Sequence, residues 1–330
     1  NAGGGGANKN LIINGNMVCS QRGTSFSNVT SSQFCLDRFS VDVSGGGAFN
    51  VTQDTSAPEG FEKSLKLEVN TADSSIGAAD AYRVTQAVEG QNTAQVELGA
   101  STAKAMALSF YVKSSVTGTY GVGLANNAET ENFVAEYTIS SANTWEKKTI
   151  NIPIRTSGTW LTDNSVGIGV RWDLGSGTDY NGTAGQWQTT SAKVYRTSSC
   201  VNLIATGSAT WFLTGVQLEV GQNPTSFEHE PFERTLERCQ RYAYDITGVD
   251  AYIGGSPGTG SSYDFYLPMA FPEMRATPSA TNYTYTASNS AISNGAFANS
   301  AKSWKVSIRP NSVTTEQGVV IDSGIFAAEI

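Results

Sequence analysis

The chain has few charged residues and no cluster of lysine and arginine. Charged residues make up 15% of its 330 residues, whereas about 25% is typical of globular proteins. The formal net charge is −8, and binding through nucleic-acid phosphates requires several converging cations. We therefore predict that the protein does not bind nucleic acid.

The chain also lacks the residues of common metal sites. It has one histidine, and its four cysteines show no C-x-x-C spacing, so a zinc site has no ligand pattern. We predict no zinc and no other cofactor. A bridge between Cys19 and Cys35 is one reading of the cysteines. We favour the other, in which Cys19, Cys35, Cys200 and Cys239 are free buried thiols.

Long apolar runs are missing as well. No run approaches the roughly 18 apolar residues that span a bilayer, and no signal-peptide pattern opens the chain. We therefore expect no membrane insertion. Residues 1–9 form a Gly-rich, flexible lead-in that begins with Asn1. We expect a fragment or a processed product, with an attachment region upstream.

What the chain does contain is alternation of apolar and polar residues, which predicts half-buried strands. Glycine, serine, threonine and asparagine are abundant between these runs, as in turns. Many antiparallel strands at this spacing predict an all-β fold, with a jelly-roll sandwich over residues 10–222. The predicted inward positions are Leu65, Leu67 and Val69; Met106, Leu108, Phe110 and Val112; Phe133, Ala135, Tyr137 and Ile139; Ile150, Ile152 and Ile154; and Val166, Ile168, Val170 and Trp172.

The last strand of this domain changes phase. Apolar residues at Trp211 and Leu213 give way to Val216, Leu218 and Val220, a one-residue shift that predicts a bulge at Gly215. An arm and a short connecting helix follow over residues 223–245, with Pro231 at the first helical position. The apolar stripe of this helix is Phe232, Leu236, Cys239 and Tyr242.

Residues 246–330 are predicted to form a smaller C-terminal β-domain. Its strands include Tyr263, Phe265 and Leu267, then Trp304–Arg309 and Val319–Asp322. We expect the apolar tail, residues 325–330, to form a final strand of this domain. The alternative is packing against symmetry-related subunits.

Six segments along the chain carry a family resemblance. They are NLIINGNM (10–17), LDRF (36–39), SFYVKSSVTGTY (109–120), NTWEKKTI (143–150), DLGSG (173–177) and TSFEHEPF with CQRY (225–242). In this order they resemble landmarks of phage virion appendage proteins, tail-fibre-like chains common in marine and metagenomic phages. The resemblance covers about residues 10–245. In this chain Glu230 stands where such proteins usually carry a basic residue.

The resemblance implies a jelly-roll domain similar to carbohydrate-binding modules, carried on the virion surface, often as a homotrimer. It favours a structural, non-enzymatic tail-fibre subunit that contributes to host attachment, held by other virion proteins through an N-terminal or missing region. A host-surface glycan is the candidate ligand. The alternatives are a head fibre or capsid decoration protein, and a polysaccharide depolymerase. In a trimer the helix stripe faces either the axis or its own sandwich.

The loop from Asp173 to Gln188 is the predicted ligand-contacting element of the sandwich. Tyr180 and Trp187 offer flat apolar rings, while Asp179 and Asn181 can hydrogen-bond sugar hydroxyls. The alternative reading places Trp187 in the core. A structural calcium ion at Asp179 and Asn181 is a further option, although the spacing does not complete a twelve-residue calcium loop.

Catalysis has weaker support in the sequence. His229 lies between two glutamates but has no nucleophile motif beside it, so we favour a packing or hydrogen-bonding role over general-base catalysis. Paired carboxylates could hydrolyse glycans if a cleft held them roughly 5 to 10 Å apart. Asp163, Asp173 and Asp179 are the candidates, and solvated surface positions are the favoured reading of each.

Overall fold

The computed structural model describes residues 9–247, 250–254, 263–268, 273–288, 290–300, 303–310 and 316–330, with side chains at 9–247, 273–279 and 325–330. The chain divides into two compact units, residues 1–231 with Ile330, and residues 232–329. The predicted limits of the arm, 223 and 245, stay predictions. In the described part of the chain, no helix has the length and apolar character needed to cross a bilayer.

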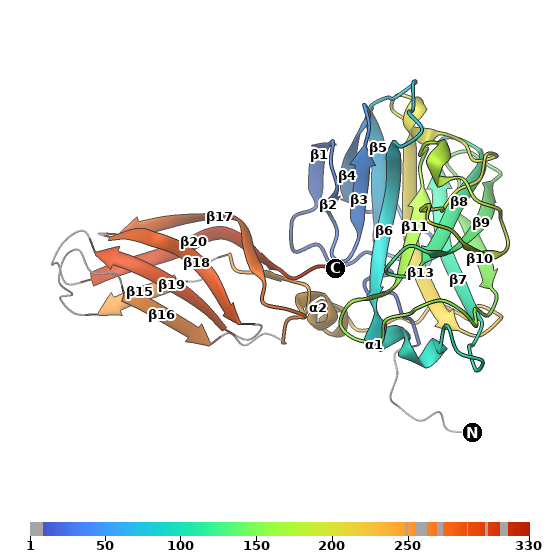
Figure 1. Ribbon diagram of the computed structural model, residues 1–330. Helices are drawn as coiled ribbons and strands as arrows, with labels where there is room; N and C mark the ends of the chain where they lie inside the picture. Colours follow the sequence, from blue (N-terminus) through green and yellow to red (C-terminus); the bar gives the residue numbers. More distant parts are fainter. Residues whose placement is uncertain are drawn as a thin grey trace. The chain divides into compact units, whose positions relative to one another are not determined.

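The first unit is a sandwich of two antiparallel sheets (Figure 1). The six-stranded sheet has the order β1 (Ser25–Val29), β4 (Ala48–Asp54), β5 (Ser64–Thr71), β13 (Thr210–Val220), β7 (Met106–Ser114) and β10 (Glu146–Ile152). The seven-stranded sheet has the order β12 (Trp187–Thr189), β9 (Glu131–Ile139), β8 (Gly118–Ala125), β11 (Val166–Asp173), β6 (Ala81–Glu89), β3 (Ser40–Ser44) and β2 (Gln33–Phe34). This is the jelly-roll type of fold that the sequence predicts.

The core lies between the two sheets and is built by the alternating apolar residues. Phe110 on β7 crosses to the facing sheet, where its ring lies 5.1 Å from that of Tyr137 and 5.9 Å from that of Trp172. The predicted inward positions are confirmed except at Val166 and Ile154. Val166 is only partly buried and faces the outside of the seven-stranded sheet, because the register of β11 with β6 shifts between Val166 and Ile168. Ile154 is 53% exposed because β10 ends at Ile152, so the prediction of a buried Ile154 is wrong.

The predicted bulge of β13 is confirmed. Its register with β7 shifts between Thr214 and Gln217, and Gly215 has a φ of 61°. A Cβ atom at Gly215 would lie 2.8 Å from the ring of Phe61 and 2.9 Å from that of Tyr111. Glycine is therefore needed both for the backbone conformation and for the close approach of these rings.

Residues 10–16 lie against β13 beside this bulge. The side chain of Asn10 donates to the Val216 carbonyl over 3.0 Å and accepts a hydrogen bond from the Leu218 amide over 3.1 Å. The Asn10 amide also donates to Glu228 over 2.8 Å. Asn10 in segment 10–17 and Glu228 in segment 225–242 are therefore in direct contact.

Short helices connect the strands of the sandwich: α1 (Gly90–Thr93), η1 (Ala94–Val96), η2 (Thr178–Tyr180) and η3 (Leu203–Ala205). The four cysteines of the chain are buried and carry free thiols.

The second unit begins with α2 (Phe232–Gln240). Cys239 and Tyr242 are buried as the stripe predicts, but Phe232 is 52% exposed. The predicted stripe is therefore only partly covered within the chain, and its first residue, Phe232, lies at the exposed start of the helix. Thr235, one turn before Cys239, is buried instead.

The described strands of this unit form two antiparallel sheets. One contains β14 (Ala243–Asp245), β20 (Glu316–Ala327), β15 (Asp250–Gly254) and β17 (Ser279–Ser288), and the other has the order β16 (Tyr263–Pro268), β19 (Ser303–Pro310) and β18 (Ser290–Ser300). The predicted strands therefore exist, and Ile325–Ala327 of the tail pair with β14 inside the same unit.

Candidate functional site

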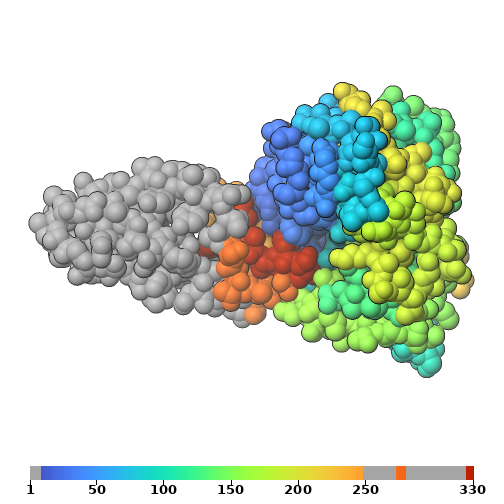
Figure 2. All heavy atoms as spheres, turned by 45° about the horizontal axis from the view of Figure 1, so that its top comes forward, coloured from blue at the N-terminus to red at the C-terminus, as the bar shows by residue number. Residues whose placement is uncertain are grey.

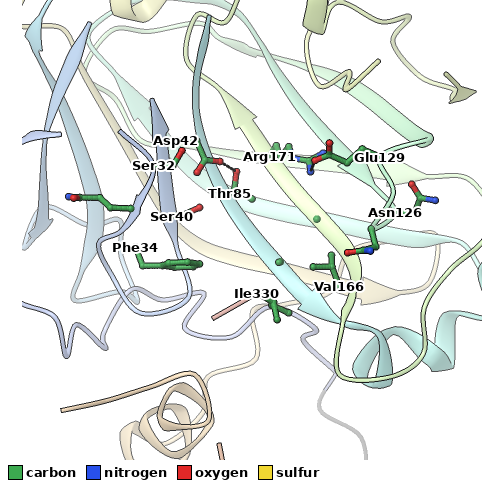
Figure 3. Close-up of a pocket in the computed structure, with 14 residues that line it drawn as sticks. Ser32, Phe34, Ser40, Asp42, Thr85, Asn126, Glu129, Val166, Arg171 and Ile330 are labelled. Atoms are coloured by element: carbon green, nitrogen blue, oxygen red, sulfur yellow. Dashed lines mark hydrogen bonds and ion pairs between the residues drawn. The ribbon is translucent and has the colours of Figure 1, made fainter. Parts of the chain in front are cut away.

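The outer face of the seven-stranded sheet is hollowed by a pocket of about 370 Å³ (Figure 3). This volume falls in the range of small-molecule sites. We call it the groove. Its lining comes from β2, β3, β6 and β11, from the turn between β8 and β9 and from Ile330. It includes Phe34, Asp42, Thr85, Asn126, Glu129 and Arg171.

The groove is assembled from segments far apart in the sequence. In the space-filling view, early residues (blue to cyan) lie beside residues from the middle of the chain (green to yellow) on one surface of the sandwich (Figure 2). The cause is the order of the strands, because β11 lies next to β6 and β6 next to β3. Alternation then turns Asp42, Thr85 and Arg171 away from the core.

One wall of the groove is held by Asp42. Its carboxylate receives a hydrogen bond from Arg83 over 2.9 Å and another from the Thr85 hydroxyl over 2.8 Å. Both donors lie on β6, the strand adjacent to β3. The acceptor and the hydroxyl are therefore fixed in place before any ligand arrives.

Arg171 supplies cationic donors to the groove. Its Nη2 pairs with Glu129, which also pairs with Lys193 over 2.6 Å. Arg171 is only 7% exposed, and its Nε and Nη1 atoms are buried without a hydrogen-bond partner. Burial lowers the pKa of Arg171, yet a guanidinium stays charged at neutral pH. Buried donors normally have partners, so these two atoms leave the environment of Arg171 incompletely satisfied.

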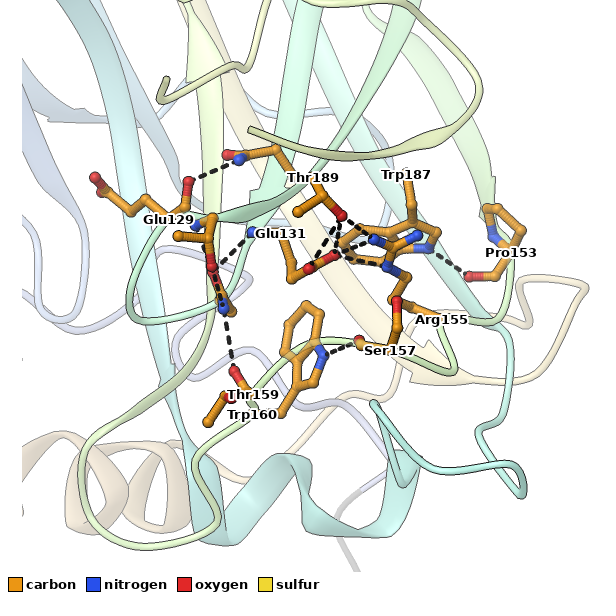
Figure 4. Close-up of polar contacts among 12 residues, drawn as sticks. Glu129, Glu131, Pro153, Arg155, Ser157, Thr159, Trp160, Trp187 and Thr189 are labelled. Carbon is orange, nitrogen blue, oxygen red and sulfur yellow. Dashed lines mark hydrogen bonds and ion pairs between the residues drawn. The ribbon is translucent and has the colours of Figure 1, made fainter. Parts of the chain in front are cut away.

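A second cluster lies at the β12 edge of the same sheet (Figure 4). The rings of Trp160 and Trp187 meet edge to face at 5.5 Å. Trp187 donates to the Pro153 carbonyl over 2.8 Å, and Trp160 donates to the Ser157 carbonyl over 3.0 Å. Both indoles are half-buried, so their polar atoms are satisfied by the protein itself.

Asn126 connects this edge to the groove. Its side-chain amide donates to the Thr159 carbonyl over 3.0 Å, and its Oδ1 accepts the amides of Thr130 and Glu131. The Glu131 carboxylate in turn accepts a hydrogen bond of 2.7 Å from Arg155. The turn that carries Glu129 is therefore held by the loop that carries Trp160.

The structure does not gather the predicted ligand-contacting residues around one point. Tyr180 packs against Tyr195 at 4.9 Å and donates its hydroxyl to the Ala79 carbonyl over 2.9 Å. Trp187 packs instead against Phe133 and Trp160. Glycan contact by these residues stays a prediction.

Asp179 lies within the η2 turn, and Asn181 directly follows it. Asp179 is exposed, while the side-chain oxygen of Asn181 is buried without a hydrogen-bond partner. In the part of the chain that the structure describes, no group of three or more His, Cys, Asp or Glu side chains could hold a metal ion. A calcium ion at this turn is an untested option.

The three candidate carboxylates differ in their surroundings. Asp163 and Asp179 are exposed, as expected. Asp173 is fully buried and lies 3.6 Å from Arg196, so the prediction of a solvated Asp173 is wrong. Burial raises the pKa of this carboxyl to about 6. Asp173 cannot reach a substrate, because no part of it is accessible.

His229 lies among aromatic rings. Its imidazole is 5.3 Å from the ring of Phe61 and 4.9 Å from that of Phe227. These contacts agree with the predicted packing role.

Sequence reasoning missed Asp42, Thr85 and Arg171. One signal was present for Arg171, which occupies the polar position between Val170 and Trp172 in a predicted strand. Arg171 lies near Asp42 and Thr85 because of the order of the strands in the sheet. The alternation of apolar and polar residues does not predict that order.

No protein-family model and no curated protein matches the chain. Similar solved structures include a domain described as the enzymatically active domain of bacteriophage CBA120 tailspike protein 4, with 13% identity, a TM-score of 0.35, and coverage of 64% of this chain and 22% of that one. TmCBM61, solved in complex with β-1,4-galactotriose, has 12% identity and a TM-score of 0.31, with 65% and 100% coverage. A putative sugar-binding protein from Bacteroides thetaiotaomicron VPI-5482 has 12% identity and a TM-score of 0.35, with 64% and 100% coverage.

These similarities concern the sandwich and its fold. The neighbours include carbohydrate-binding modules as well as the tailspike domain, of whose length the match spans about a fifth. At these identities and TM-scores the matches carry no argument about function, which depends on the site.

Proposed function

We propose that the protein is a non-catalytic subunit of a phage virion appendage, and that its sandwich binds a host-surface glycan in the groove. The observation that carries the glycan part is the groove of about 370 Å³, which is lined by the Arg171 side chain and by the fixed polar groups of Asp42 and Thr85. Sugars offer oxygen acceptors and hydroxyl donors, and they need a few fixed polar groups beside apolar surface.

The other groove residues suit the same ligand. Asp42 and Thr85 are held by hydrogen bonds on adjacent strands, which lowers the entropic cost of binding. Phe34 adds an apolar ring to the lining. Hydroxyl groups, a carboxylate and a guanidinium around one apolar surface form a site that can orient a polar, ring-shaped ligand.

The virion part of the proposal is supported by the segments of the sequence that resemble phage virion appendage proteins. The contact between residues 10–16 and Glu228 shows that two of these segments form one structural unit. From the resemblance we infer a surface position on the particle, a homotrimeric assembly, and attachment to other virion proteins.

The glycan part is tested on an array of neutral and acidic oligosaccharides that includes β-1,4-galactotriose. The wild-type protein is expected to bind a defined subset. Arg171→Lys keeps the charge opposite Glu129 but removes the planar guanidinium, so it should weaken that binding at least about tenfold. Retained circular dichroism shows that the variant is folded. Binding by Arg171→Lys equal to wild type overturns the groove assignment.

The virion part is tested on intact particles. Labelled antibody should mark tail appendages, and purified protein should bind host cells and reduce phage adsorption. Saturation of capsids without any effect on adsorption would establish a head fibre or decoration protein instead. Release of reducing sugar from host glycans, abolished by one Asp→Asn change, would establish a depolymerase.

A further inference from the structure

The outer face of the six-stranded sheet, opposite the groove, carries a row of alternating lysine and aromatic side chains. Lys66 on β5 lies opposite Phe212 on β13, and Phe212 lies opposite Lys113 on β7. Trp145, just before β10, extends the row with its ring 6.0 Å from that of Phe212. We call these four residues the lysine–aromatic row.

The side chains of the row are packed against one another. The Lys113 ammonium lies 3.9 Å from the ring centre of Phe212 and 5.1 Å from that of Trp145. Lys66 lies 5.9 Å from the same Phe212 ring. Such cation–π contacts hold the ammonium groups in place. Lys113 is further fixed by its hydrogen bond to the Ser56 hydroxyl over 2.6 Å.

The charges of this face are only partly compensated. Lys66 pairs with Glu68 over 2.9 Å. Among the described residues, neither Lys113 nor Lys147 forms an ion pair; Lys147 lies 5.8 Å from the Tyr111 ring, one step along the sheet from the row. Partial burial lowers the pKa of Lys113; the Asp54 carboxylate partly opposes this shift, and the nearby Lys66 charge adds to it. An anion placed over Lys113 would relieve this unfavourable environment.

The spacing of the cations suits an extended polymer. Lys66 and Lys113 are two strands apart, which corresponds to about 10 Å across a sheet. The half-buried Trp145 stands at the end of the same line and offers a ring to the apolar face of a sugar. In a chain with a net charge of −8, two unpaired lysines are too few for the phosphates of a nucleic acid, but they match a sugar polymer with periodic carboxylates.

We propose that the lysine–aromatic row is a second binding surface, which takes a linear polysaccharide carrying carboxylate groups. The carboxylates lie on Lys66, Lys113 and Lys147, and a sugar ring stacks on Trp145. This surface is separate from the groove and does not depend on it, since the two lie on the outer faces of different sheets.

The proposal is tested by affinity electrophoresis at low salt, with polygalacturonate as the probe and its methyl-esterified form as the uncharged equivalent. The wild-type protein should bind polygalacturonate at least about tenfold more tightly than the ester. Lys113→Gln and Trp145→Ala should each lose most of this binding. Lys104→Gln removes the same charge from an ion pair with Glu97 elsewhere, and should bind like wild type.

Lys147 is exposed, so Lys147→Gln keeps the test valid if Lys113→Gln does not fold. Thr85→Val in the groove should leave polygalacturonate binding unchanged, which separates failure of this proposal from failure of the groove assignment.

Equal affinity of wild type, Lys113→Gln and Lys147→Gln overturns the proposal, as does the absence of binding. Oligo(dT) binding with the same lysine dependence overturns it in favour of nucleic acid. If light scattering gives a lower particle mass for Lys113→Gln than for wild type, the row is instead a contact between copies of the chain, and the proposal is overturned.

Discussion

A Cβ atom on Gly15 would lie 2.1 Å from the carbonyl oxygen of Val216. The same two residues are joined by a hydrogen bond of 2.9 Å from the Val216 amide to the Gly15 carbonyl. The N-terminal segment therefore meets the bulge of β13 backbone to backbone, and no side chain fits between them. This contact ties the start of the sandwich to its last strand.

Gly15→Ala should destabilise the sandwich for this reason. The added methyl group has to push backbone aside, which costs about 1–3 kcal/mol or more. The control is Gly207→Ala, because a Cβ atom at Gly207 would meet nothing within 4 Å. Urea denaturation followed by tryptophan fluorescence measures both. Equal unfolding midpoints for the two variants would contradict the close approach.

Asp173 should give the protein a distinctive pH dependence. Burial raises the pKa of Asp173 to about 6, whereas the pKa of an unfolded aspartate is about 3.9. The folded state therefore binds this proton more tightly, so the contribution of Asp173 to stability is full below about pH 3.9 and is lost as pH rises through about 6.

The comparison with Asp173→Asn isolates this effect, because asparagine does not titrate. The free energy of unfolding of wild type minus that of Asp173→Asn should be larger at about pH 4 than at about pH 7.5. Urea titrations at the two pH values measure it. A difference that stays constant with pH would show that the buried carboxyl does not titrate as described.

Asn126→Asp should loosen the link between the groove turn and the Trp160 loop. The substitution removes the donor to the Thr159 carbonyl and buries a negative charge beside Glu131, at a cost of about 1–3 kcal/mol. Asn127→Asp is the control, because Asn127 is the exposed neighbour in the same turn. Denaturation midpoints and tryptophan emission are the measurements. If both variants match wild type, Asn126 does not hold the two loops together.

The strands were predictable because their signal is local. Leu65, Leu67 and Val69 show the period of two that a half-buried strand imposes, and the phase change at Gly215 marks the bulge without knowledge of any partner strand. Ile154 shows the limit of this reasoning. Its alternation continues past Ile152, where β10 loses its partner on β7 and the strand ends.

The site was less predictable because it depends on contacts between distant segments. Asp42 and Arg171 face the same groove only because β6 lies between β3 and β11, and strand order leaves no mark on local sequence. Asp173 shows the same limit, since its burial is tolerated through Arg196 on a later segment. The aromatic residues Tyr180 and Trp187 suggested a shared platform, but their rings pack against different neighbours.

The central claim is that the groove binds a glycan, and Thr85→Val tests it most directly. The substitution keeps the shape of the side chain and removes the hydroxyl that lines the groove, while Asp42 keeps its bond to Arg83. Thr138→Val is the matched control, on an exposed position of β9 that does not line the groove. The measurement is calorimetric titration with the oligosaccharide that binds best on the array. Thr85→Val should bind the oligosaccharide at least about tenfold more weakly, and Thr138→Val should bind it like wild type. Equal affinities of both variants and wild type would show that the groove does not bind the glycan.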